Sequence, residues 1–247
     1  MNFSHVTFGE YDSWRDWGLI LTGDDVGFPK VSALIDDMKI YGVDADQYDV
    51  ERDRRKLSFT FLVRDAAAWP EVVTRVTAAL HGKKKSIIRS SEPEYTYIGR
   101  CVVDRYRTSK AMGTLVIAVD AEPYKYKAYV TEEMLQITGK TITVDTKYIT
   151  PAIVTIRPAV TDIVSITLNG LARNPVTGEA ESIMARNLAA GEELVINGEL
   201  CTVTSGDVNR YGDMEMWEFP NLKEGNQIIS ASNGTCNITV RYRPRYI

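Results

Sequence analysis

An alternation of apolar and polar residues with a period of two is the pattern that most constrains the fold. It runs through four separate segments, at residues 57–63, 115–119, 164–168 and 238–243. Because successive side chains of a β-strand point to opposite faces, each segment is typical of a strand with one face on a core. Buried parallel strands read instead as continuous apolar runs, so the alternation predicts antiparallel sheets.

One segment has helical spacing instead. Its apolar residues recur three to four positions apart: Trp69, Val72, Val73, Val76 and Leu80. Pro70 suits the first turn of a helix, and His81-Gly82 supplies its end. We therefore predict one amphipathic helix over about residues 66–81, packed against a sheet. Residues 31–38 could form a second helix, although Asp36-Asp37 favours a loop, and both interpretations stay open.

The second half of the chain contains all three Asn-Gly pairs, at residues 169–170, 197–198 and 233–234. Asn-Gly between two strands is typical of a type I′ hairpin turn, because both central residues of that turn need a positive φ. We therefore predict hairpins at these pairs, most clearly at 197–198. No convincing helical spacing accompanies them, so we interpret the second half as a compact antiparallel β-sandwich.

The change between the two halves falls near Pro123, which follows a long predicted strand and cannot donate to a central ladder. The length of 247 residues is enough for two medium domains with sizeable cores. We expect these domains to cover residues 1–128 and 129–247. No Gly- or Ser-rich linker marks the boundary, so we expect the domains to be closely connected.

Composition argues against several classes of function. The formal net charge is −4, and a mildly acidic chain is not suited to coat nucleic acid or an anionic membrane. No apolar stretch approaches the roughly 18 residues of a membrane span. We expect no specific nucleic-acid binding and no membrane insertion. The basic run Lys83-Lys84-Lys85 is interpreted as a solvated strand edge rather than a nucleic-acid surface.

Cysteine and histidine are scarce. The three cysteines, Cys101, Cys201 and Cys236, are odd in number and widely spaced, which is typical of reduced thiols in a cytoplasm. A Cys201–Cys236 disulfide remains an alternative. The only histidines are His5 and His81, which leaves little room for His-based catalysis or zinc binding. The N-terminus lacks the basic and apolar regions of a signal peptide.

Motifs that carry chemistry are missing from the sequence. There is no nucleophile elbow, no P-loop and no dinucleotide-binding glycine pattern. The segment Asp44-Ala45-Asp46-Gln47-Tyr48-Asp49 resembles a calcium loop, but it lacks the glycine and the final glutamate of an EF-hand. We therefore expect no enzyme activity, no catalytic residue, no cofactor and no metal.

Aromatic residues near Glu218 have two interpretations. Trp217 and Phe219 stand at positions i and i+2, so on a strand they would share one face, and we favour a position in the core. Alternatively, exposed aromatics such as Trp217 and Tyr211 could stack on sugar rings. That alternative would make the protein a carbohydrate-binding or host-adhesion module.

Several segments together resemble the distal tail (Dit) proteins of siphophages. The N-terminal domain of that family is matched in order by Leu80-His81-Gly82-Lys83, by Tyr95-Thr96-Tyr97-Ile98-Gly99-Arg100 and by Glu122-Pro123-Tyr124-Lys125-Tyr126. Its C-terminal domain is matched by the Phe-Pro-x-Leu-x-x-Gly-x-Asn turn at 219–226 and by the tail at 242–246. The resemblance extends from about Tyr41 to Ile247.

This resemblance implies a mainly β protein with an N-terminal tail-tube-like domain, which has one helix and an extended hairpin, and a C-terminal galectin-like β-sandwich. Distal tail proteins form a ring, typically a hexamer, that joins the tail tube to the tail tip or baseplate. The implied protein is a structural virion component of a phage or prophage tail, assembled in the host cytoplasm. The implied partners are further copies, the tail tube protein and a tail-associated tip or baseplate protein.

We place the extended hairpin, or arm, in about residues 24–56. This segment is polar, lies between two predicted strands and is long for a simple connection. An arm that becomes ordered on a neighbouring subunit would account for its length. Candidate subunit-interface residues in its acidic turn are Asp44, Asp46, Tyr48 and Asp49.

Overall fold

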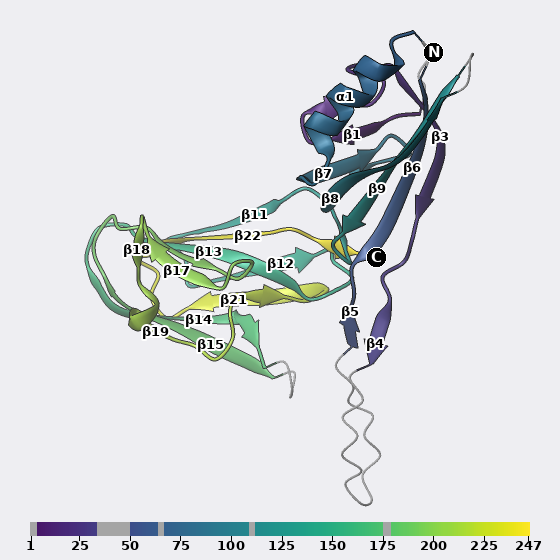
Figure 1. Cartoon of the computed structure of the whole chain (residues 1–247). Helices are drawn as coiled ribbons and strands as arrows, with labels where there is room; N and C mark the ends of the chain where they lie inside the picture. The colour runs from purple at the N-terminus through teal and green to yellow at the C-terminus, as the bar shows by residue number, and fades with distance from the viewer. Residues whose placement is uncertain (1–3, 34–49, 64–66, 109–111, 175–178) are drawn as a thin grey trace, which may run out of the picture. The chain divides into compact units, whose positions relative to one another are not determined.

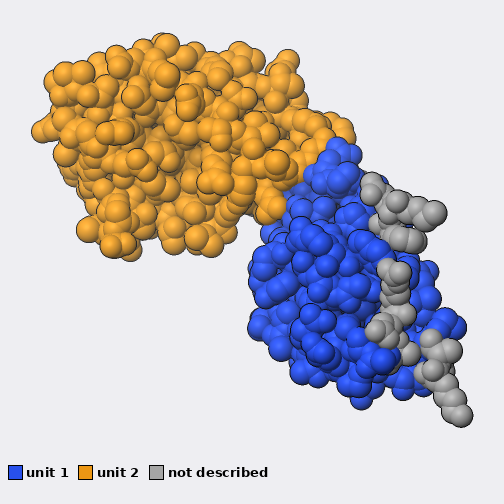
Figure 2. Space-filling view, turned by 90° about the horizontal axis from the view of Figure 1, so that it is seen from above, with its two compact units in different colours: residues 1–126, 247 blue, residues 127–246 orange. Residues whose placement is uncertain are grey.

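A computed structural model of the chain describes residues 4–33, 50–63, 67–108, 112–174 and 179–247 (Figure 1). It divides into two compact units, residues 1–126 with residue 247 and residues 127–246, coloured separately in Figure 2. The predicted fold class is confirmed, because the described residues are mainly antiparallel β-strands. The boundary predicted after residue 128 stays a prediction about folding domains, because compactness does not test whether the parts fold separately. No helix in the described ranges is long and apolar enough to cross a membrane.

The first unit contains one α-helix and ten strands in its described residues. In chain order they are β1 (Val6–Phe8), β2 (Tyr11–Asp12), β3 (Leu19–Val26), β4 (Val31–Ala33), β5 (Val50–Arg52), β6 (Arg55–Val63), α1 (Trp69–Leu80), β7 (Lys84–Arg89), β8 (Glu92–Thr108), β9 (Gly113–Ala121) and β10 (Lys125–Tyr126). The large sheet has the order β2-β1-β7-β8-β9-β6-β3, with β10 beside β8. Strands β4 and β5 pair only with each other in the described part of the chain.

The alternation at residues 57–63 produces strand β6 as predicted. Its core side carries Leu57, Phe59 and Phe61, each at most 1% exposed. The predicted helix is also confirmed, and Figure 1 shows it lying across one face of the sheet. Trp69 at its start packs so closely on β9 that a Cβ on Gly113 would come within 2.5 Å of the indole ring. Helix and sheet therefore enclose one aromatic core.

The large sheet is rolled around this core. Strands β1 and β6 are separated by three strands in the sheet order, yet the ring of Phe8 on β1 lies 5.8 Å from that of Phe59 on β6. At one end of the sheet, Arg89 of β7 donates two hydrogen bonds, of 2.7 and 2.9 Å, to the carboxylate of Asp24 on β3. Strand β3, at one edge of the sheet, is thus hydrogen-bonded through its side chain to β7, which lies near the other edge.

The second unit is an antiparallel sandwich. Its elements are β11 (Val130–Leu135), β12 (Gly139–Val144), β13 (Thr150–Pro158), β14 (Ile163–Arg173), β15 (Ala180–Leu188), β16 (Leu194–Asn197), β17 (Thr202–Ser205), β18 (Val208–Asn209), η1 (Tyr211–Asp213), β19 (Met214–Glu215), β20 (Asn221–Leu222), β21 (Gly225–Ala231), β22 (Cys236–Tyr242) and β23 (Arg245–Tyr246). One sheet has the order β11-β22-β13-β16-β17-β18, with β20 beside β13, and the other has β12-β21-β14-β15-β19.

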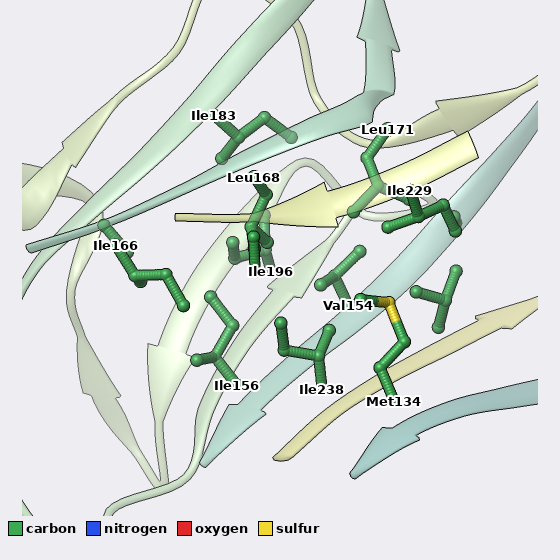
Figure 3. Close-up of a cluster of buried hydrophobic side chains, with 14 of the residues drawn as sticks. Met134, Val154, Ile156, Ile166, Leu168, Leu171, Ile183, Ile196, Ile229 and Ile238 are labelled. Carbon is green, nitrogen blue, oxygen red and sulfur yellow. The ribbon is translucent and has the colours of Figure 1, made fainter. Parts of the chain in front are cut away.

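Apolar side chains from both sheets of this unit face one another (Figure 3). Val154 of β13, Ile196 of β16 and Ile238 of β22 come from the first sheet. Ile166 of β14 and Ile229 of β21 come from the second, and all five side chains are fully buried. The interdigitated layer between two antiparallel sheets is the arrangement expected of a β-sandwich.

Only one of the three Asn-Gly pairs lies at a hairpin, and its loop is longer than predicted. Asn197 does end β16 at a hairpin, but the loop has four residues, and its side-chain oxygen accepts hydrogen bonds from the N–H groups of Glu199 and Leu200. Asn169-Gly170 lies inside β14 at a bulge. Asn233-Gly234 connects β21 to β22, which belong to different sheets. The hairpin prediction is therefore wrong for two pairs.

At two of these pairs only glycine fits, because a Cβ atom would clash with the backbone of a neighbouring segment. A Cβ on Gly170 would lie 2.0 Å from the carbonyl oxygen of Ile228. One on Gly198 would lie 2.4 Å from the carbonyl oxygen of Pro220. At these two positions glycine allows a neighbouring backbone segment to approach closely, in addition to any role in a turn.

One smaller expectation is also wrong. Val164, expected on the core face of its strand, is 83% exposed, because Ile163 takes the buried position before β14 becomes regular.

The lysine run lies beyond the end of β1. Strand β1 pairs only with Ile87–Arg89, so among the described strands Lys84 and Lys85 pair with β8 alone. Their side chains form ion pairs of 2.7 and 2.8 Å with Glu122 and Glu10.

The ion pair between Arg89 of β7 and Asp24 of β3 leads to a prediction about stability. Asp24→Asn removes the charge that the half-buried Arg89 guanidinium contacts, so we expect the free energy of unfolding to fall by about 1–2 kcal/mol. Asp25→Asn is the matched control, because Asp25 is exposed on the same strand and should change stability by less than about 0.5 kcal/mol. Urea unfolding of both variants measures the difference in the free energy of unfolding. Equal losses in the two variants would show that the Arg89–Asp24 pair does not stabilise the sheet.

Candidate interaction surfaces

The arm predicted at residues 24–56 begins as an extension of the large sheet. Strands β3 and β6 pair as far as Val26 and Leu57. Beyond them, the N–H of Gly27 donates to the carbonyl of Lys56 at 2.9 Å, and the N–H of Asp53 donates to the carbonyl of Lys30 at 2.9 Å. The ribbon β4–β5 continues this antiparallel path, as Figure 1 shows. The described part of the segment is therefore an extended two-stranded ribbon.

The four interface candidates in the arm, Asp44, Asp46, Tyr48 and Asp49, lie outside the described residues. Their role stays a prediction. The described base of the arm nevertheless bears on it, because an isolated two-stranded ribbon is marginally stable in water. Strands β4 and β5 pair only with each other among the described strands, so no third strand supports the described base of the arm.

The face of the large sheet opposite α1 is a second candidate surface, called here the outer face. Uncharged side chains on this face lie on β6, β8 and β9: Ser58, Thr60, Leu62, Val102, Thr114, Val116 and Ala118. Charged residues flank them at one end, where Lys56, Asp120 and Arg100 are neighbours in register. They also flank them along β8, where Arg105 and Arg107 are the register partners of Val116 and Thr114. Uncharged residues bordered by charges are typical of protein contact surfaces.

A groove of about 580 Å³ lies between α1 and residues 10–17. Its aromatic wall consists of Tyr11 and Trp17, whose rings stack with centroids 5.2 Å apart. Its charges are largely compensated, since Arg15 pairs with Asp16 at 3.0 Å and Arg75 approaches Glu71 at 3.8 Å. This balance argues against selective binding of an anion.

The two aromatic candidates of the second half have different environments. Trp217 is 91% exposed, so the interpretation as a core residue is wrong. The strand β19 ends at Glu215, and the alternation that would bury Trp217 together with Phe219 does not apply in the bend that follows. Phe219 packs against the core, and the ring of Tyr211 lies 6.2 Å from it. Tyr211 is half exposed.

The cysteines and histidines have structural positions. All three cysteines are free thiols, which rules out the Cys201–Cys236 disulfide in this structure. Cys101 and Cys236 are buried, and desolvation raises the pKa of the Cys101 thiol to about 11. His81 follows α1, where its Nδ1 accepts a hydrogen bond of 3.2 Å from the N–H of Val103. Among the described residues, no three His, Cys, Asp or Glu side chains gather as metal ligands.

A charged cluster stiffens the sandwich beside Tyr211. The guanidinium of Arg210 donates to Asp213 at 2.6 Å and to the carbonyl of Asn187 at 2.8 Å, and it pairs with Glu192. The hydrogen bond from Arg210 lowers the pKa of Asp213. Burial opposes ionisation of Glu192, but hydrogen bonds from the Ala189 N–H and other donors, together with Arg210, still hold its pKa below the usual value.

Both the sequence and the fold resemble those of known proteins. Residues 174–246 match the family model described as "Siphovirus-type tail component, C-terminal domain". The whole chain is similar to SPP1 Dit, described as a paradigm of the hub adsorption apparatus in phages that infect Gram-positive bacteria. That likeness has a TM-score of 0.75, 13% identity and coverage of 100% of both chains. The resemblance to the Dit family is confirmed.

Weaker likenesses involve chains of the phage p2 baseplate in its activated conformation. The strontium structure gives a TM-score of 0.46 at 10% identity, covering 97% of this chain and 98% of that one. The calcium structure gives 0.44 at 9% identity, covering 98% of each chain. No curated protein matches the sequence. The chain is therefore similar in fold to SPP1 Dit and, over residues 174–246, in sequence to the C-terminal family model.

The Arg210 cluster makes a prediction about pH. A carboxyl whose pKa is lowered by folding stabilises the folded state above its unfolded pKa, and that stabilisation is lost as pH falls through the folded pKa. We expect the thermal midpoint to fall between about pH 5 and pH 3, and to fall less steeply in Arg210→Gln. Arg186→Gln, which breaks an exposed pair with Glu215, is the control and should keep the wild-type slope.

Proposed function

We propose that this protein is the ring-forming hub that joins the phage tail tube to the tail tip or baseplate. The observation that carries the proposal is that one known fold, that of SPP1 Dit, covers both units of the chain. The match of residues 174–246 to a siphovirus tail component supports the same conclusion independently of the fold. The role is structural, so the proposal assigns no catalytic residue.

A closed ring would use heterologous contacts, in which one surface of each subunit meets a different surface of the next. We assign the arm to one side of this contact and the outer face to the other. The ribbon β4–β5 has no third strand beside it among the described residues, so a supporting surface would stabilise it. The uncharged side chains of the outer face lose no charge solvation when such a contact buries them. All subunits of such a ring point the same way, so its two ends differ and can bind different partners.

The proposed partners are further copies of this chain, the tail tube protein and a tip or baseplate protein. The place of action is the virion tail, with assembly in the host cytoplasm. Native mass spectrometry over a range of protein concentrations tests self-association, and we expect a hexamer with an open centre in negative-stain images. A chain that stays monomeric at every concentration and does not join purified tail tubes would contradict the hub.

The arm is tested by replacing residues 44–49 with a Gly-Ser linker of equal length. This change keeps the length of the segment but removes Asp44, Asp46, Tyr48 and Asp49. We expect loss of the ring with an unchanged thermal midpoint, because the replaced residues lie outside both described cores. Rings that form normally would remove these residues from the interface.

The outer face is tested by Leu62→Glu, because the register neighbours of Leu62, Ile20 and Thr114, are uncharged. A carboxylate buried between subunits without a partner is strongly unfavourable, so we expect at least about a tenfold loss of association. Val164→Glu is the matched control, since Val164 is an apolar residue that is 83% exposed in the other unit. Size-exclusion chromatography with light scattering compares the two, and equal behaviour would argue against the outer face.

A second candidate function is a carbohydrate-binding or host-adhesion module. The exposure of Trp217 favours it, because a large apolar ring in water is available for stacking. Glycan binding that disappears in Trp217→Ala, with the fold intact, would support this candidate. Full glycan binding by that variant would exclude Trp217 as the stacking residue.

A further inference from the structure

A small pocket opens at one end of the β-sandwich. Its volume is about 230 Å³, and its wall comes from the loop after β16, from the hairpin β17–β18 and from η1. Six of its lining residues are Cys201, Thr202, Thr204, Asp207, Asn209 and Tyr211. The pocket lies within one compact unit, so its shape depends on local structure alone.

Strand geometry explains why its hydroxyl and amide groups gather. Thr202 and Thr204 stand two residues apart on β17 and so share one face, while Val203 between them is buried. Asn209 of β18 is the register partner of Thr204, which places it on the same face. Gly206 has a φ of +56° in the tight turn and is followed by the exposed Asp207.

The aromatic wall of the pocket is held in place before any ligand arrives. The ring of Tyr211 rests on Phe219, which packs against the core. Its backbone N–H donates to Asn209 Oδ1 at 2.9 Å. The preceding Arg210 is fixed by its backbone bond to Val203 and by its pairs with Asp213 and Glu192. Such pre-ordering reduces the entropy that binding must overcome.

The chemistry of the lining excludes some ligand classes. The lining residues include no Lys, Arg or His, so a phosphate or carboxylate would find no counter-charge. One carboxylate is too few for a calcium or magnesium ion, which takes about six or more oxygens. Asp207 has no hydrogen-bonded or ion-paired partner among the described residues, so its oxygens can accept from a ligand.

The same groups suit a neutral ligand with several hydroxyls. The threonine hydroxyls can donate and accept, Asp207 accepts, and the Asn209 amide can donate because its oxygen is already used by the Tyr211 N–H. The face of the Tyr211 ring can contact a patch of C–H groups. The volume lies below the roughly 300–1,000 Å³ of pockets for drug-sized molecules, which fits a single ring.

We propose that this pocket binds one ring of a neutral saccharide. The apolar side of the sugar stacks on Tyr211, and its hydroxyls bond to Thr202, Thr204 and Asp207. The affinity of a single site is in the millimolar range, because few groups contact the ligand. If the protein assembles as proposed above, several copies would present the site together and raise the avidity. The binding itself does not depend on that assembly.

Cys201 provides a direct readout at the rim of the pocket. Cys101 and Cys236 are buried, so iodoacetamide should modify Cys201 alone in the folded full-length chain. Glucose, galactose, N-acetylglucosamine and N-acetylgalactosamine are the probes, each titrated to about 100 mM, a range that reveals millimolar binding. We expect at least one of them to slow the modification of Cys201 in a saturable manner, while sulfate at equal concentration has no effect.

Variants locate the site. Asp207→Ala and Thr204→Val should each weaken the protecting sugar at least about fivefold, since each removes a hydrogen bond to a hydroxyl. Asp207 is exposed and unpaired within the described residues, so its replacement leaves the fold intact. Leu135→Ala is the control and should bind normally, because Leu135 is exposed on β11, which three strands separate from β17 in the sheet. Tyr211→Ala should abolish protection, with circular dichroism reporting its fold.

Three results would overturn the inference. The first is that none of the four sugars protects Cys201 or gives a saturation-transfer NMR signal. The second is that Asp207→Ala and Thr204→Val both bind as tightly as the wild type. The third is that Trp217→Ala removes binding while the pocket variants keep it, which would move the sugar to the exposed indole. Ring assembly is measured separately, so its failure would not be mistaken for any of these.

Discussion

The first unit buries an arginine beside a network of hydrogen bonds that joins three of its strands. Arg55 is 2% exposed and lies on the core side of β6, with its guanidinium 5.5 Å from the ring of Tyr97. Its register neighbours on β9 and β8 are Ala121 and Gly99. A Cβ on Gly99 would lie 2.5 Å from Val119 and 2.7 Å from Ala121, so these small residues keep the space that Arg55 occupies.

A buried cation needs nearby negative charge, because desolvation is costly. Glu92 supplies it through space, and hydrogen bonds from Tyr97 at 3.1 Å and from Arg89 at 2.8 Å hold its carboxylate in place. Arg89 in turn donates to Asp24 on β3. These hydrogen bonds join β3 to β7 and β8 near the place where β3 and β6 leave the sheet as the arm. The base of the arm is anchored by electrostatics, whatever the remainder of the arm contacts.

Prediction from sequence succeeded where one local signal decides the outcome. The alternation in β6 and the spacing in α1 each reflect a single buried face, and both elements formed as expected. Prediction failed where the conformation depends on contacts with distant segments or on where a strand ends. Asn169-Gly170 serves a close backbone approach inside a strand, and Trp217 turns outward because its strand ends two residues earlier. The pocket beside Tyr211 combines three segments, and no linear pattern marks such a site.

The ladder between β3 and β6 continues beyond the core. Backbone bonds from the Gly27 N–H to Lys56 and from the Asp53 N–H to Lys30 carry the pairing on to β4 and β5. A displacement of the ribbon would therefore load these bonds along the strands and reach the core through β6, which is paired on both sides. The arm and the sheet are thus mechanically coupled, so that movement of one is transmitted to the other.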